Sequence, residues 1–116
     1  MPSLTNFTKR ERAQLRELSL MAWQRELSAE LEKLYEDFGR WGDDSISAFD
    51  LSDRIHEFHN GVSRELYGRY VGIDPVVTVS RAVARGLLAE SDLSSALVKK
   101  LASQIAIFRK LPEDPE

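Results

Sequence analysis

The chain has 116 residues with 19 acidic and 16 basic side chains, a net charge of −3 and 42% hydrophobic residues, which is the composition of a globular protein rather than a disordered one. It contains no cysteine, and this excludes disulfides, thiolate metal sites and cysteine nucleophiles. No apolar run approaches the length of a membrane span, and the N-terminal segment lacks the apolar core of a secretory signal. We therefore expect a cytoplasmic protein that does not enter the membrane.

A long first helix is predicted from about Lys9 to about Arg40. Thr8 and Glu11 have the spacing of a capping box, in which each side chain accepts a hydrogen bond from the other residue's backbone amide. No proline or glycine follows until Gly39. At 1.5 Å per residue the helix is about 45–50 Å long, which exceeds the width of a compact domain of this size. We expect it either to kink near Met21 or to project from the body of the protein.

The apolar residues of this helix fall on two different faces. Leu15, Leu18 and Ala22 share one side. A larger set falls on roughly the opposite side: Leu20, Trp23, Leu27, Leu31, Leu34, Phe38 and Trp41. A monomeric bundle offers one neighbouring core, so the sequence predicts that the smaller set, Leu15, Leu18 and Ala22, is the interface with a second chain.

The second helix is predicted from about Ala48 to Tyr70. Ser47 and Asp50 provide a start signal of the same kind as that of the first helix. Gly61 interrupts the pattern of good helix formers, and Gly72 is expected to end the helix.

A third, short helix is predicted from Asp74-Pro75 to just before Gly86, because Asp is a good N-cap and Pro is favoured at the first helical position. The segment is rich in β-branched residues, so a strand is the competing interpretation. The spacing of Val76, Val79 and Val83 favours the helix.

A fourth helix is predicted from about Asp92 to Lys110, with Ser91 as its cap. Short connections between amphipathic helices indicate an all-α fold, a single-domain antiparallel bundle of about four helices spanning residues 1–116. Residues 1–7 and 112–116 are expected to be frayed.

Four residues of the second helix, Asp53, Arg54, His56 and His59, are the candidates for chemistry. Asp53, His56 and His59 follow one another at intervals of three, as ligands of a divalent metal on one helical face would. Arg54 and His59 are the candidate catalytic pair of a small hydrolase, the Arg holding phosphate and the His moving a proton. The alternative, which we favour, is that both histidines are structural or solvated.

The spacing of Arg54 and His59 also resembles the R-x4–6-H motif of the HEPN family, all-helical domains that include metal-independent ribonucleases. The resemblance covers these two residues and the helical class. Ile55 stands where that motif usually has a polar residue, and the pair lies in the middle of the chain rather than near the last long helix. We therefore infer no membership of that family.

The start of the first helix is the only candidate segment for nucleic-acid binding. Its basic residues are Lys9, Arg10, Arg12 and Arg16, so that residues 1–16 carry a net charge of +3, whereas residues 26–44 carry −5. Since the whole chain is acidic, nucleic acid is not the expected partner.

The preferred hypothesis is therefore a protein–protein interaction module that forms a homodimer, or binds another protein, through its first helix. Two such helices in antiparallel orientation set opposite charges beside each other. The sequence favours no enzymatic activity over this, and no cofactor is predicted.

Overall fold

The computed structural model describes residues 6–112. The helical elements in chain order are α1 (Lys9–Gly42), α2 (Ala48–Glu57), a π-helical segment (Phe58–Ser63), α3 (Arg64–Tyr70), α4 (Pro75–Ala84), a 3-10 turn (Glu90–Asp92) and α5 (Ser95–Lys110). The described part of the chain contains no strand. The predicted all-α class with a long first helix is thus confirmed.

Helix α1 is continuous over 34 residues and does not break near Met21. The predicted capping box is present: the Glu11 amide donates to the Thr8 hydroxyl over 3.0 Å, and the Thr8 amide donates to the Glu11 carboxylate over 2.8 Å. The helix ends at Gly42, and Asp44 takes the left-handed backbone conformation in the turn that follows. Of the two expected outcomes for so long a helix, projection is the one observed.

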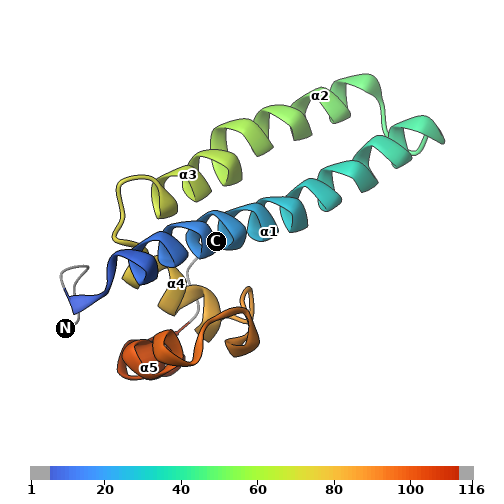
Figure 1. Ribbon diagram of the computed structural model, residues 1–116. Helices are drawn as coiled ribbons and strands as arrows, with labels where there is room; N and C mark the ends of the chain where they lie inside the picture. Colours follow the sequence, from blue (N-terminus) through green and yellow to red (C-terminus); the bar gives the residue numbers. More distant parts are fainter. Residues whose placement is uncertain (1–5, 113–116) are drawn as a thin grey trace.

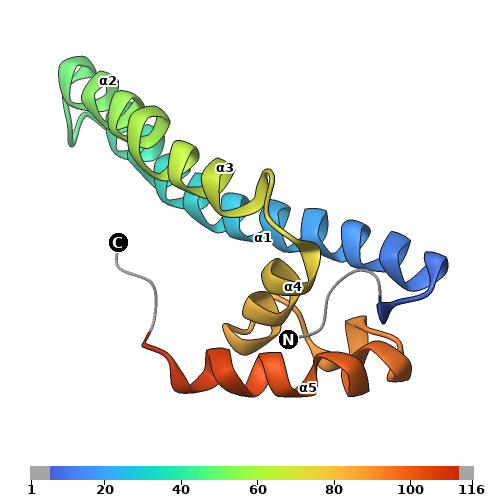
Figure 2. The same ribbon diagram turned by 90° about the vertical axis from the view of Figure 1, so that its left-hand side faces the viewer.

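Helix α1 and the segment α2–π–α3 form a long helical hairpin (Figure 1). Helix α4 packs on the N-terminal half of α1, on another side from α2 and α3, and α5 packs on α4 (Figure 2). The distal half of the hairpin, which contains the α1–α2 turn, extends beyond α4 and α5. The molecule measures 54 × 27 × 23 Å and has a radius of gyration of 17.2 Å. A compact chain of this length has about 13 Å.

The predicted second helix is divided in the structure. Ser47 caps α2 through the amide of Asp50, as expected. Six residues, Phe58–Ser63, then adopt the wider π-helical geometry before α3 begins. This stretch contains Asn60 and Gly61, which are poor helix formers, so local propensity offers little resistance to the change.

Helix α4 confirms the helical interpretation of the β-branched segment. The Asp74 carboxylate accepts from the amide of Val76 over 2.9 Å, and Gly86 follows the helix with a φ of 80°. The helix is buried on several sides, since Val76, Thr78, Val79, Ser80, Ala82 and Val83 are all inaccessible. The packing of α4 between α1 and α5 therefore outweighs the weak helix propensity of its valine and threonine residues.

Two sequence-based predictions about the C-terminal region and the chain ends need correction. Ser94, not Ser91, caps the last helix, because residues 90–92 form a separate 3-10 turn and α5 begins at Ser95. Phe7 is not frayed: its side chain belongs to the core, and Lys100 lies 5.4 Å from the centre of its ring. Residues 1–5 and 113–116 lie outside the described residues.

The core forms where α1, α4 and α5 meet. Leu15, Leu18 and Ala22 are in it, together with the apolar side chains of α4 and of α5. Leu15 and Ala22 have 0% of their surface exposed. The prediction that these three residues form an interface with a second chain placed them on the surface, and this is wrong: α4 and α5 of the same chain supply the second neighbour that the sequence seemed to lack.

Candidate interaction surface

The opposite face of the hairpin carries the exposed apolar side chains. Leu20, Leu27, Leu31 and Phe38 follow one another at intervals of four or seven residues and so share one side of α1. Helix α2 lies beside this stripe and adds Ile55 on the same side. We call hairpin face the set formed by Leu20, Leu27, Leu31, Leu34, Tyr35 and Phe38 of α1 with Ile55 of α2.

Most of the hairpin face is open to solvent. Tyr35 is 79% exposed and Leu20 62% exposed, while Leu31 and Phe38 are 44% and 42% exposed. Leu31, Leu34, Tyr35 and Phe38 line a shallow groove of about 450 Å³ together with Ser28 and Glu32. Isolated exposed apolar residues are ordinary, but a contiguous row of this length indicates a binding surface. In the sequence, this surface corresponds to part of the larger apolar set of the first helix. The prediction from the sequence placed the interface at the smaller set instead.

The other side of the distal hairpin is polar and closed by ion pairs. Asp37 is buried there and accepts from Arg40 over 2.7 Å and from Arg54 over 3.3 Å. This side, which is the side of α4, needs no further layer. The hairpin is thus amphipathic, and its apolar side is the one that nothing in the described chain covers.

The proximal half of the hairpin is fixed to α4 by a charged network around Glu26. Its carboxylate accepts from Arg69 over 3.1 Å, from the Tyr70 hydroxyl over 2.8 Å and from Arg81 over 3.2 Å. Burial and the neighbouring Glu26 carboxylate raise the pKa of Tyr70 well above its ordinary value. The Tyr70 ring stacks on Trp23 with centroids 5.8 Å apart. This network fixes the proximal end of the hairpin to α4, and most of the hairpin face lies beyond it in the distal half.

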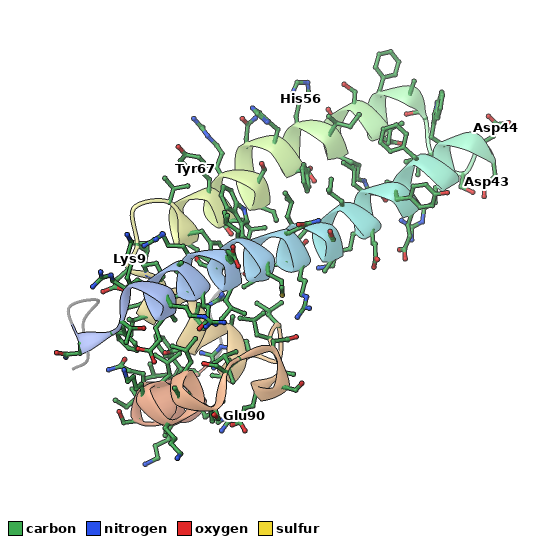
Figure 3. The ribbon with its side chains drawn as sticks, viewed as in Figure 1. Lys9, Asp43, Asp44, His56, Tyr67 and Glu90 are labelled. Carbon is green, nitrogen blue, oxygen red and sulfur yellow. The ribbon has the colours of Figure 1, made fainter. Side chains whose placement is uncertain are left out.

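The two ends of the hairpin carry opposite charge. The distal part, residues 30–57, has nine acidic and three basic side chains. The proximal part, residues 9–25 and 58–70, has seven basic and three acidic side chains. Figure 3 shows the two ends, with Lys9 at one and Asp43 and Asp44 at the other.

The candidate catalytic pair does not share a site. Arg54 pairs with Asp37 on the polar side of the hairpin. His59 lies more than a third of a turn away around the helix, on the side of the hairpin face, and it is exposed. His56 is also exposed and extends away from α1 (Figure 3).

The metal candidate is not supported either. No group of three or more His, Asp or Glu side chains in residues 6–112 is arranged to hold a metal ion, so Asp53, His56 and His59 are not a ready-made site. Successive positions on one exposed helix leave these side chains pointing outward, and no second element brings further ligands to them.

The basic residues at the start of α1 do not form one patch. Lys9, Arg12 and Arg16 lie on the side of α1 that continues to Leu27 and Leu34, whereas Arg10 lies on the side that continues to Tyr35. Arg12 is partly buried and donates to the carbonyl of Phe7 over 3.3 Å. This leaves little of the continuous basic stripe that nucleic-acid binding requires.

A comparison with known protein families, with curated proteins and with solved structures found no match to the chain. Among the described helices, including the 34-residue α1, none has a stretch long and apolar enough to cross a membrane.

Proposed function

We propose that the protein is an interaction module that self-associates through the hairpin face. The observation that carries this proposal is the row of exposed apolar residues along α1 and α2 on the side without α4 and α5. Two amphipathic helices are half of a four-helix bundle, and two copies placed face to face complete an antiparallel bundle of four helices. From the sequence, such a bundle is expected within one chain; here we propose that two chains form it.

The dimensions of the face suit a second copy. The face from Leu20 to Phe38 is about 27 Å long and two helices, or about 20 Å, wide, so it buries on the order of 500 Å² on each copy. The total of about 1,000 Å² is enough for a reversible protein–protein interface. The aromatic residues Tyr35 and Phe38 are of the kinds enriched in such interfaces. The Glu26 network at the proximal end and the Asp37–Arg54 pair in the distal half hold α1 and α2–α3 together, which keeps the loss of conformational entropy on association small.

Sedimentation velocity over a range of protein concentrations tests the proposal. We expect a reversible dimer for the natural chain and a monomer for Leu31→Glu, because a charge at the centre of an apolar interface loses its hydration without gaining a partner. Ala29→Glu is the matched control: it introduces the same charge two residues away, at an exposed position on another side of α1.

Two results would contradict the proposal. One is a chain that stays monomeric at the highest concentrations tested. The other is a dimer that Ala29→Glu dissociates as readily as Leu31→Glu. Far-UV circular dichroism of both variants establishes that the helices are intact, so that a change in mass reports on association alone.

A further inference from the structure

We infer that the second copy binds in antiparallel orientation, with the acidic end of each hairpin placed on the basic start of α1 in the other. This inference rests on the proposed self-association and names its geometry. The hairpin face has one apolar centre and two flanks of opposite charge, and only an antiparallel arrangement brings unlike flanks together.

The apolar spacing sets the register. The apolar residues of α1 form two rows, each with a repeat of seven residues. One row is Leu20, Leu27 and Leu34; the other is Leu31 and Phe38, which follow Leu27 and Leu34 by four residues. In an antiparallel seam, residues of one row face residues of the other row. Leu20 then faces Phe38 of the second copy and Leu27 faces Leu31, so that the two-fold axis passes at the level of Ala29.

The charges fit the same register without adjustment. Arg16 precedes Ala29 by thirteen residues and Asp43 follows it by fourteen, so each lies about 20 Å from the axis along α1. The axis therefore brings Arg16 beside the acidic turn of the second copy, where Asp43 and Asp44 extend from the end of the hairpin (Figure 3). Symmetry makes this contact twice.

A parallel dimer has the opposite consequence. It would place Arg16 on Arg16 and the acidic turn on the acidic turn, at both ends of the interface. The aromatic side chains around the turn, among them Phe38 and the exposed Phe49, add to the antiparallel arrangement because guanidinium groups bind well on aromatic faces. Charge and aromatic content thus both favour one orientation.

Cross-linking measures the orientation directly. The chain has no cysteine of its own, so introduced cysteines report alone. Gln24 and Tyr35 are both exposed, lie on the same side of α1 and are nearly equidistant from the level of Ala29. We expect Gln24→Cys mixed with Tyr35→Cys to form a disulfide-linked heterodimer. Gln24→Cys alone should not, because antiparallel copies hold those positions about 15 Å apart along the axis, beyond the reach of a disulfide.

Charge reversal provides a second test. Arg16→Glu should weaken dimerisation about tenfold, since two symmetric contacts are lost, and Asp44→Lys added to the same chain should restore it. Lys99→Glu is the matched control, because this lysine is exposed on α5, which packs on the other side of the molecule from the hairpin face. Raising the salt concentration should weaken the natural dimer more than the Arg16→Glu dimer.

The outcomes separate this inference from the proposed function. If Leu31→Glu dissociates the dimer but Gln24→Cys links to itself, or Arg16→Glu behaves like Lys99→Glu, self-association stands and the antiparallel orientation is wrong. If the natural chain never dimerises, both are wrong. Efficient linkage of Gln24→Cys to Tyr35→Cys, together with rescue by Asp44→Lys, supports the orientation.

Discussion

In the structure the Leu15 face of α1 forms the core and the Leu31 face is exposed. Comparing the stabilities of Leu15→Ala and Leu31→Ala tests this assignment. Leu15 is fully buried between α1, α4 and α5, whereas Leu31 is 44% exposed on a face that lacks a second layer. Replacing a fully buried leucine by alanine costs about 3–5 kcal/mol, because the apolar contacts are lost and a cavity remains. A leucine that is half exposed and leaves no closed cavity costs about 1 kcal/mol.

Urea unfolding followed by far-UV circular dichroism measures both values. With a slope of about 1.5 kcal/mol per molar urea, Leu15→Ala should lower the midpoint by about 2 M or more and Leu31→Ala by less than about 1 M. The measurement is made at a protein concentration at which the chain is monomeric, since association would add to the apparent stability. Equal losses, or a larger loss for Leu31→Ala, would refute the assignment of the core to Leu15.

Further predictions concern buried polar groups. Glu26→Ala should lower the free energy of unfolding by about 2–4 kcal/mol, because it leaves the partly buried Arg69 and Arg81 without this partner. Loss of the exposed Glu30–Lys33 pair should cost less than about 0.5 kcal/mol, and the same urea titration measures both values. Ser80→Ala should raise the thermal midpoint or leave it unchanged, because the buried Ser80 hydroxyl has no hydrogen-bond partner among residues 6–112; a clear decrease would reveal one. The hydrogen bond from Lys100 lowers the pKa of Glu11, and the Ala89 amide lowers that of Asp92. Their stabilising contribution is present above the ordinary values of 4.5 and 3.8 and is lost as the pH falls through the lower folded values, so Glu11→Gln with Asp92→Asn should flatten the acid limb of a stability–pH curve.

The local features of the fold could be predicted from the sequence because they depend on neighbouring residues. The capping pairs at Thr8 and Ser47 gave the starts of α1 and α2, and Gly86 gave the end of α4. The cap of α5 was misplaced because Ser91 and Ser94 are equally good caps, and only the packing of Leu93 decides between them.

The interface prediction failed for a different reason. Helical periodicity shows that Leu15, Leu18 and Ala22 share a face, but it does not identify what covers that face. The missing information was present in the segment from Val76 to Val83, which has almost no polar side. Such a helix must be covered on both sides, and a narrow face with a small residue such as Ala22 allows the close approach that it needs. Of the larger set, Trp23 packs against Tyr70 and the core, whereas Leu20, Leu31, Phe38 and Trp41 are left for solvent or for a second chain.

The π-helical segment Phe58–Ser63 makes the hairpin unusually tolerant of one kind of change in chain length. Hydrogen bonds in a π-turn enclose one residue more than those of an α-helix, so the path from α2 to α3 contains a residue that a plain α-helix would not need. Removing Asn60 would restore α-helical winding and leave the residues on either side in place. A deletion elsewhere in α2 or α3 would instead rotate everything beyond it by about 100°, separating the hairpin face from the contacts that hold Glu26.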